Sequence, residues 1–446
     1  MTSKKPRSAK KNLLWRIHSW MGLYAGVIIA FLSLTGAAAL FRMEIDEALN
    51  PSLYLVEKES TRMTLNAIVS EVTEAHPDKE LFEVYVPTEA TGTYNLRLMA
   101  KNAPRIFPVF WEVFVNPYTG EILGERNYYK TFNYYLRNLH VRFYEAFWGR
   151  LIVGLAGLAL LISTITGFLI YGRFMKKQSL GEIRGKNLRM RQADLHKFIG
   201  VLALVFNLMI AITGTWLGLQ GQLQKAFSIE RPNIYKRAEN PLTPKEDLAM
   251  TANFDQALKK TSSIFPQLIP KTVRPSRDGA RTIEIVGDVP GQAYERLSNK
   301  LVLDKGNLNT LLKYDINEDD FGGKLFFVQE SFHFGDFAGI WLKILYAFLA
   351  LTSGFLALSG FIIYLKRTEK KRTEKPSFVE LRPLLYRWVF GILAFCAIVG
   401  IMSVIWGIGV PSLTVIILFY GLLTFLLLKA LFLWVRTRFS KKPLQV

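Results

Sequence analysis

Four of the five histidines of this 446-residue chain occupy matched positions in an internal repeat. They fall into two aligned pairs, His18 with His196 and His140 with His333. The alignment of the first pair also matches Thr35-Gly36 with Thr213-Gly214, and that of the second matches Gly167-Phe168 with Gly360-Phe361. Paired neutral imidazoles on facing helices are a common way to hold a haem iron. The pattern therefore predicts two bis-histidine haem sites, with hydrogen-bonded histidines at helix ends as the alternative.

The elements that carry these histidines are apolar stretches long enough to cross a bilayer core, which takes roughly 20 residues. Half of the chain is hydrophobic, and six such stretches cover 13–41, 147–172, 197–220, 340–365, 384–409 and 411–434. The sequence thus predicts an α-helical membrane bundle. A single cysteine, Cys396, excludes a disulfide scaffold.

Lysines and arginines concentrate in the segments 1–16, 173–197 and 366–387 and in the C-terminal tail, and the net charge is +20. The positive-inside rule assigns these segments to the cytoplasm and the two long segments between the spans to the opposite side. We therefore expect no nucleic-acid binding, although an anionic-lipid or nucleic-acid patch is the competing interpretation of the charge. A bacterial inner membrane, with both termini cytoplasmic and two periplasmic domains, is the expected location.

Each long external segment has the pattern of a small α+β domain. A helix-like stretch at 65–72 is followed by a hairpin at Asn116-Pro117-Tyr118-Thr119-Gly120, and a second helix at 254–264 by a hairpin near 303–307. The expected order is a cytoplasmic N-terminus with the first span (1–41), external domain (42–146), span (147–172), cytoplasmic loop (173–196), span (197–220), external domain (221–339), span (340–365), loop (366–383), a two-helix hairpin (384–434) and a tail (435–446).

Both copies of the repeat begin on the cytoplasmic side, so their symmetry axis should run along the membrane normal. This axis would bring His18 to His196 at the cytoplasmic face and His140 to His333 at the outer face. A continuous helix from His140 to Tyr171 would be about 46 Å long, which predicts an outer site at or beyond the membrane surface. Gly36 and Gly214 should lie five helical turns, about 27 Å, beyond His18 and His196 on the same helix faces. There they would let a planar group approach the backbone, or they would serve small-residue helix packing.

The histidine helices, together with the hairpin Val115-Asn116-Pro117-Tyr118-Thr119-Gly120-Glu121-Ile122-Leu123-Gly124, resemble the PepSY-associated transmembrane proteins. Within that family the chain looks like the inner-membrane ferric-siderophore reductases. The resemblance implies two non-covalent b-type haems with His18, His196, His140 and His333 as axial ligands. It also implies a haem-dependent oxidoreductase that takes part in iron uptake.

The leading hypothesis is transmembrane electron transfer from a cytoplasmic reductant, such as a flavin or NAD(P)H reductase, to a periplasmic ferric siderophore. Arg137 and Arg142 are candidates for binding the haem propionates, with lipid headgroups as their alternative partners. The rival hypotheses are a siderophore or metal permease, and a non-enzymatic membrane protein whose external domains bind peptides.

Overall fold

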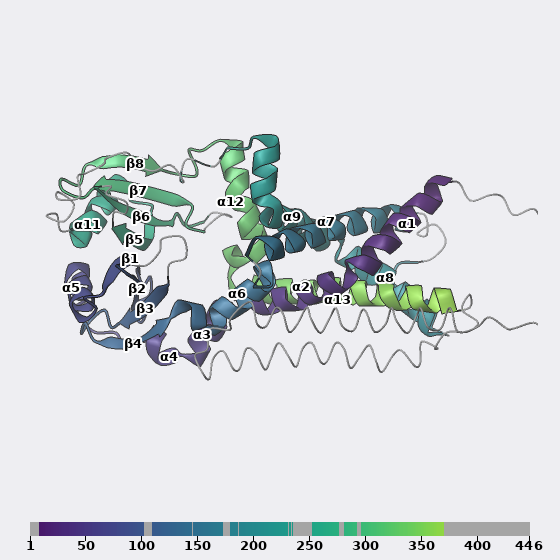
Figure 1. Cartoon of the computed structure of the whole chain (residues 1–446), viewed down its shortest axis with the longest axis horizontal. Helices are drawn as coiled ribbons and strands as arrows, with labels where there is room; N and C mark the ends of the chain where they lie inside the picture. Colours follow the sequence, from purple (N-terminus) through teal and green to yellow (C-terminus); the bar gives the residue numbers. More distant parts are fainter. Residues whose placement is uncertain are drawn as a thin grey trace, which may run out of the picture.

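The computed structural model describes residues 9–101, 109–144, 146–172, 179–185, 187–230, 232, 234, 252–275, 281–291 and 296–369. The two apolar stretches expected over 384–409 and 411–434, Cys396 and the tail lie outside the described residues. Within the described part, a helical bundle extends from one side of a β-sheet domain (Figure 1).

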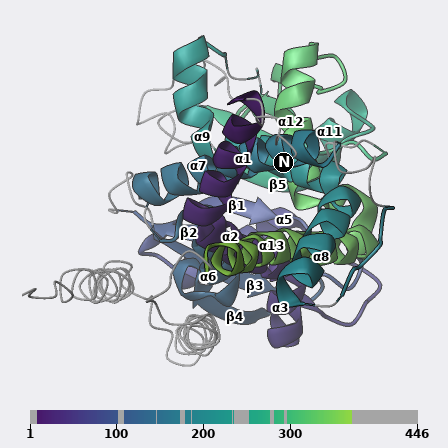
Figure 2. The same ribbon diagram turned by 90° about the vertical axis from the view of Figure 1, so that its right-hand side faces the viewer.

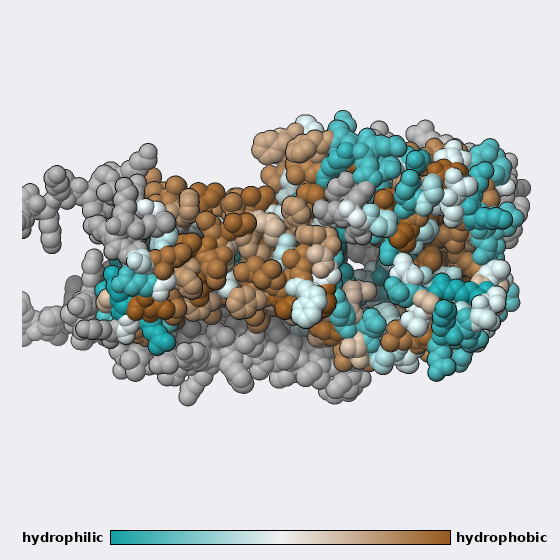
Figure 3. Space-filling model, turned by 180° about the vertical axis from the view of Figure 1, so that it is seen from behind, coloured by the Kyte–Doolittle hydropathy of each residue, from teal (hydrophilic) through white to brown (hydrophobic). Residues whose placement is uncertain are grey.

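The bundle contains three helices that are long and apolar enough to cross a membrane, counted among the described residues. A bent pair becomes a fourth if it is one span. The three are α7 (Ala146–Tyr171), α9 (Leu204–Phe227) and α13 (Gly339–Glu369), and the bent pair is α1 (Ala9–Tyr24) with α2 (Gly26–Ala39). The shorter helix α8 (Leu188–Leu202) precedes α9. These helices coincide with the first four predicted stretches, and Figure 3 shows apolar surface over the bundle and polar surface over the sheet domain.

The first and third predicted spans are interrupted at equivalent positions. The break between α1 and α2 at Ala25 bends the chain by 58°, and α8 is separated from α9 at Ala203. Ala25 and Ala203 are separated by the same number of residues as His18 and His196, so both copies of the repeat share the break. The expectation that Gly36 lies on a straight helix about 27 Å beyond His18 is therefore wrong.

The predicted continuous helix from His140 to Tyr171 is also wrong. His140 belongs to a separate helix, α6 (Phe132–Arg142), and Phe143 and Tyr144 then take positive φ values of 48° and 62° before α7 begins. In the second copy, α12 (Phe321–Phe334) ends at Gly335 with φ 64°, and the short turn η3 (Asp336–Ala338) leads into α13. Each short helix packs against a span, α6 on α2 and α12 on α9.

The main helix–helix contacts of the bundle occur in equivalent pairs, one in each copy of the repeat. Helix α7 contacts α1 and α9, and its counterpart α13 contacts α8 and α2. Figure 2 looks along the bundle from the end opposite the sheet domain. These contacts of one copy each have an equivalent in the other, as an internal two-fold axis requires.

Both external segments fold as a helix followed by a four-stranded meander, but they share one sheet. The first contributes α5 (Leu65–Ala75), β1 (Lys79–Tyr85), β2 (Tyr94–Ala100), β3 (Phe110–Val115) and β4 (Ile122–Asn127), and the second α11 (Phe254–Ile264), β5 (Ile269–Pro275), β6 (Thr282–Asp288), β7 (Asn299–Asp304) and β8 (Thr310–Tyr314). The strand order is β4-β3-β2-β1-β5-β6-β7-β8. Two separate small domains were expected; instead, β1 and β5 join them into one antiparallel sheet with one core.

The two halves are joined at a short seam. Val84 pairs with Val273 and Tyr85 with Thr272, while Glu83 and Arg274 form an ion pair across it at 2.9 Å. The helices above the seam cap each other. The carboxylate of Asp255 in α11 accepts from the backbone N–H groups of Leu65 and Asn66 at the start of α5, and the side chain of Asn66 accepts from the N–H of Phe254. Such caps satisfy N–H groups that a helix leaves free at its N-terminus.

Short helices connect the sheet to the bundle. Helix α3 (Arg42–Leu49) and helix α4 (Pro51–Tyr54) follow the first span, and the turn η1 (Tyr128–Lys130) leads from β4 into α6. Arg126 in β4 binds the buried carboxylate of Asp46 in α3 at 2.7 Å, which fixes the position of this connection. The short helices thus hold α6, and with it His140, in a defined place below the sheet.

Candidate functional site

The four matched histidines meet as two pairs, each with one ring from either copy. The ring centres of His18 in α1 and His196 in α8 lie 6.2 Å apart, at the end of the bundle farther from the sheet. Those of His140 in α6 and His333 in α12 lie 6.4 Å apart, nearer the sheet. We call these the His18 pair and the His140 pair. The repeat alignment had predicted this partnering, and the structure brings the rings together as predicted.

The hydrogen bonds around the His140 pair determine which ring nitrogen carries the proton. With the proton of Thr35 Oγ1 assigned to the carbonyl of Phe31, this oxygen accepts from His140 Nδ1, which lies 3.2 Å away. Thr213 Oγ1 likewise donates to the carbonyl of Met209 and accepts from His333 Nδ1 at 2.9 Å. Both Nδ1 atoms are therefore protonated, which leaves the lone pair of each imidazole on Nε2.

The His18 pair has the same arrangement with different partners. His18 Nδ1 lies 3.0 Å from the carbonyl oxygen of Ser163, which can only accept. His196 Nδ1 lies 2.8 Å from Ser359 Oγ, whose proton goes to the carbonyl of Leu356. All four histidines consequently present an unprotonated Nε2, the form in which an imidazole binds a metal.

Each histidine ring packs on a glycine of a neighbouring helix. A Cβ atom built on Gly36 would come within 2.9 Å of His140 Cε1, and one on Gly214 within 3.3 Å of His333 Cε1. The equivalent distances at the other pair are 3.0 Å from Gly167 to His18 and 3.4 Å from Gly360 to His196. These glycines are part of the sequence matches that revealed the repeat. They make room for the imidazole rings, whereas the two roles expected for Gly36 and Gly214 from the sequence were close approach of a planar group and small-residue helix packing.

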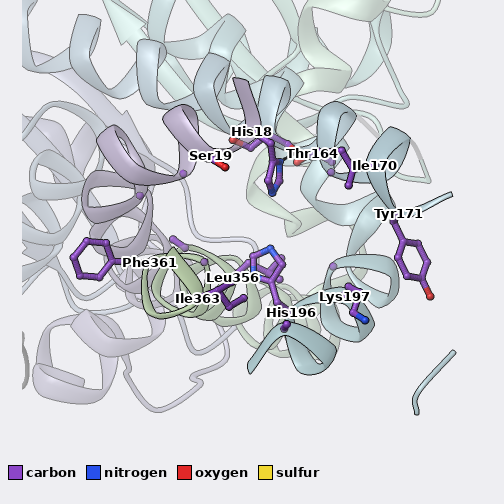
Figure 4. A pocket seen from close by; sticks show the side chains of 18 of the residues that line it. His18, Ser19, Thr164, Ile170, Tyr171, His196, Lys197, Leu356, Phe361 and Ile363 are labelled. Carbon is purple, nitrogen blue, oxygen red and sulfur yellow. Dashed lines mark hydrogen bonds between the residues drawn. The ribbon is translucent and has the colours of Figure 1, made fainter. Parts of the chain in front are cut away.

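A cavity of about 400 Å³ surrounds the His18 pair, within the usual range for small-molecule and cofactor sites. The two rings point toward one another across it (Figure 4). Its walls are mostly apolar, and aromatic and basic side chains line it as well, namely Trp15, Tyr171, Tyr364, Arg184, Lys197 and Arg367. An apolar cavity with basic residues suits a flat apolar group that carries carboxylates.

Both ring separations suit a metal ion between the rings. Two imidazoles on opposite sides of one ion, with metal–nitrogen distances of about 2.0–2.1 Å and about 1.1 Å from nitrogen to ring centre, have ring centres about 6.2–6.4 Å apart. The observed values are 6.2 and 6.4 Å. A haem iron takes only axial ligands from the protein because the macrocycle supplies the other four. The ring separations therefore suit a haem iron at each pair, and the cavity around the His18 pair adds space for the macrocycle there.

The His140 pair lies deeper in the bundle than expected. Gly157 of α7 meets Gly214 and Thr215, at the level of His333, and Gly167 of α7 meets His18. Ten residues of helix separate the two levels, which is about 15 Å. Gly157 is itself ten residues inside the span Phe147–Tyr171. The expectation of a site at or beyond the membrane surface is wrong, because it depended on the continuous helix that breaks at Phe143.

Arg137 and Arg142 lie on α6 on either side of His140 in sequence. Nε of Arg142 is buried and has no hydrogen-bond partner in the described part of the chain. Burial lowers the pKa of Arg142, and its cationic neighbours Arg137 and Arg150 lower it further. Positive charges held together in this way favour an anion beside α6. The fifth histidine, His76, is buried and bonds to the Val72 carbonyl and to Glu125, so its role is structural.

The hydroxyl and carbonyl groups that orient the rings were not assigned this role from the sequence, although a signal was present. Thr35-Gly36 and Thr213-Gly214 match in the repeat, and in the structure the threonine binds Nδ1 while the glycine faces the ring. The His18 pair shows the same motif, because Thr166 Oγ1 lies 3.2 Å from His18 Nδ1 and Ser359 Oγ lies 2.8 Å from His196 Nδ1, each just before the glycine that faces the ring.

A duplicated membrane protein, with two imidazole pairs between its copies and a shared sheet at one end, is the class that this fold and site define. The chain belongs to the family of the PepSY-associated TM region, whose model matches residues 15–367. It is also similar to a protein of Pseudomonas aeruginosa, uncharacterized protein PA4219, with 27% identity over 252 residues. That alignment covers 52% of this chain and 63% of the relative.

Proposed function

We propose that this protein transfers electrons across a membrane through two b-type haems, one held by the His18 pair and one by the His140 pair. A haem iron with two imidazole ligands takes up and releases one electron at a time. The observation that carries the proposal is the shared geometry of the pairs. Their ring centres lie 6.2 and 6.4 Å apart, and all four Nδ1 atoms have acceptors.

The spacing along the bundle supports transfer between the sites. The two pairs lie about 15 Å apart along α7, about half of the roughly 30 Å hydrocarbon core that has to be crossed. The hydroxyls and carbonyls at Nδ1 hold the rings in place, so the chain need not rearrange when the charge changes. Arg137 and Arg142 would bind carboxylates of the group at the His140 pair, and Arg367 those at the His18 pair.

The orientation in the membrane that we propose rests on the basic residues, and the proposed donor and acceptor follow from that orientation. Arg184, Lys197 and Arg367 line the cavity at the end of the bundle that lies away from the sheet. By the positive-inside rule this end faces the cytoplasm, which puts the sheet domain in the periplasm of a bacterial inner membrane. The donor is a cytoplasmic reductant, and the acceptor we propose is a ferric siderophore, in keeping with the family resemblance. One-electron reduction weakens the hold of hard oxygen ligands on iron.

The test is to purify the full-length chain in detergent and to measure its haem by the pyridine haemochrome method. We expect a Soret band and two haems per chain, both reducible by dithionite. A colourless preparation from haem-replete cells would contradict the proposal. Vesicles that hold the protein, with dithionite inside and a ferric siderophore with a ferrous-specific dye outside, test the direction and the acceptor.

A further inference from the structure

The wall of the cavity around the His18 pair breaks the two-fold symmetry of the repeat. Asn207 in α9 and Ser353 in α13 line this cavity, and so do Ile29 and Leu160. In the alignment of the two copies, Asn207 occupies the position of Ile29, and Ser353 occupies the position of Leu160. One copy therefore presents a polar pair where the other presents two apolar side chains.

The polar pair is fully enclosed. Asn207 is 2% exposed and Ser353 is 4% exposed. The hydroxyl of Ser353 donates to Oδ1 of Asn207. Since Ile29 and Leu160 fill the equivalent space in the other copy, packing alone does not require a polar pair.

The hydrogen bond also orients the amide. Ser353 holds the oxygen end, so the N–H end of Asn207 is the part of the side chain left for the cavity. An N–H group is the positive end of the amide dipole. In the low dielectric of the bundle, a positive dipole end stabilises a neighbouring group that gains an electron.

We propose that Asn207, oriented by Ser353, raises the reduction potential of the haem held by the His18 pair. This inference rests on the proposed function, because it concerns how the chain tunes the cofactor placed there. Hydrogen bonding and the polarity of the surroundings are among the means by which a protein sets a haem potential. Asn207 lines the cavity around the His18 pair, so the potential of the haem proposed there is expected to change more than that of the haem at the His140 pair.

The experiment is a spectroelectrochemical titration of the purified full-length protein. In Asn207→Leu we expect the midpoint of one haem to move to a lower potential, namely the haem that is absent from His18→Ala. Ser353→Ala, which frees the amide without removing it, should shift the same midpoint by less. The matched variant Ile29→Asn with Leu160→Ser rebuilds the polar pair in the first copy, and it should shift this midpoint upward.

Several outcomes would overturn the inference. They are an unmoved midpoint in Asn207→Leu with both haems retained, an equal shift of both haems, or an upward shift. If Asn207→Leu fails to retain the haem, the midpoint potential of the variant Ile29→Asn with Leu160→Ser tests the inference in its place. A midpoint in that variant that does not rise counts against the inference. A colourless wild-type protein would instead overturn the proposed function, so the two failures are distinguishable.

Discussion

The hydroxyl of Thr213 in α9 lies 2.9 Å from Nδ1 of His333 in α12, and it accepts a hydrogen bond from this ring because its own proton is donated to the Met209 carbonyl. The contact joins a span to a short helix that returns from the sheet domain. It fixes both the orientation and the tautomer of a ring whose other nitrogen faces His140. Outer partners of this kind are as much a part of a metal site as the ligands themselves.

Replacing Thr213 by valine should weaken haem binding at the His140 pair. Valine keeps the shape but removes the acceptor, and losses of such partners typically cost about 10- to 100-fold in affinity. The rate of haem transfer to apomyoglobin measures the effect. Thr215→Val is the matched control, since that hydroxyl donates to the Ala211 carbonyl within its own helix. Equal retention in both variants would show that the Thr213 contact does not support the ligand.

Alanine at His18 and alanine at His196 should each remove the same haem. The two rings lie 6.2 Å apart in one cavity, so under the proposed function each would supply one of two ligands to a single site. We expect the haem content to fall from two to one per chain, with the same spectrum left in both variants. His76→Ala should keep both haems, because His76 bonds within the sheet domain. Different residual spectra in the two variants would contradict this pairing.

Gly36→Ala should displace the His140 ring. The added methyl group would lie 2.9 Å from Cε1, closer than a carbon–carbon contact allows. Overpacking of this kind typically costs about 1–3 kcal/mol. We expect a changed low-spin signal in electron paramagnetic resonance for one haem, or its loss. Gly221→Ala in α9 meets no atom within 4 Å and serves as the control. Unaltered signals in Gly36→Ala would mean that the ring does not rest on this backbone.

The seam of the sheet should weaken in acid. Burial opposes the ionisation of Glu83, but Arg274 and Arg97 outweigh it and hold its pKa below the ordinary value of 4.5. The stabilisation is therefore complete above about pH 5 and is lost as the pH falls through the folded-state pKa. Removing one partner of a buried ion pair costs about 3–5 kcal/mol. We expect somewhat less for Glu83→Gln, since the side chain of Arg274 is 31% exposed.

Thermal unfolding of the wild type and Glu83→Gln between pH 8 and pH 4 tests this expectation. The gap between their melting temperatures should be widest at neutral pH and should narrow toward pH 4. Glu80→Gln, an exposed position on the same strand, should stay within about 0.5 kcal/mol of the wild type. A gap that does not depend on pH would exclude the proposed charge interaction as its source.

The sequence predicted the first four apolar stretches, the meander hairpins and the partnering of the histidines, because hydrophobic runs, turn residues and a repeat are local or periodic signals. It failed at the helix breaks. Ala25 and Ala203 are ordinary helix-forming residues, and Phe143 and Tyr144 take a left-handed conformation that side chains of this kind rarely adopt. The second copy carries the missing signal, since Gly335 and Gly339 with positive φ mark the same break.

The single sheet was also not predicted from the sequence. The seam rests on two residue pairs between β1 and β5. β5 contains prolines at positions 270 and 275, and proline is typical of an edge strand. Strand pairing between segments nearly 190 residues apart depends on how the helices place them, which no local pattern encodes. The depth of the His140 pair depends in the same way on the turn at Phe143.

The shared seam has a consequence for how such a protein could have arisen. One copy of the repeat holds one imidazole of each pair, half of the sheet and an unpaired edge strand, so alone it would form neither site. Before the duplication, such a unit could have worked only as a symmetric dimer with an isologous interface. Fusion into one chain removed the requirement that both halves be identical. Asn207 opposite Ile29 is the kind of difference that a dimer of identical chains could never have carried.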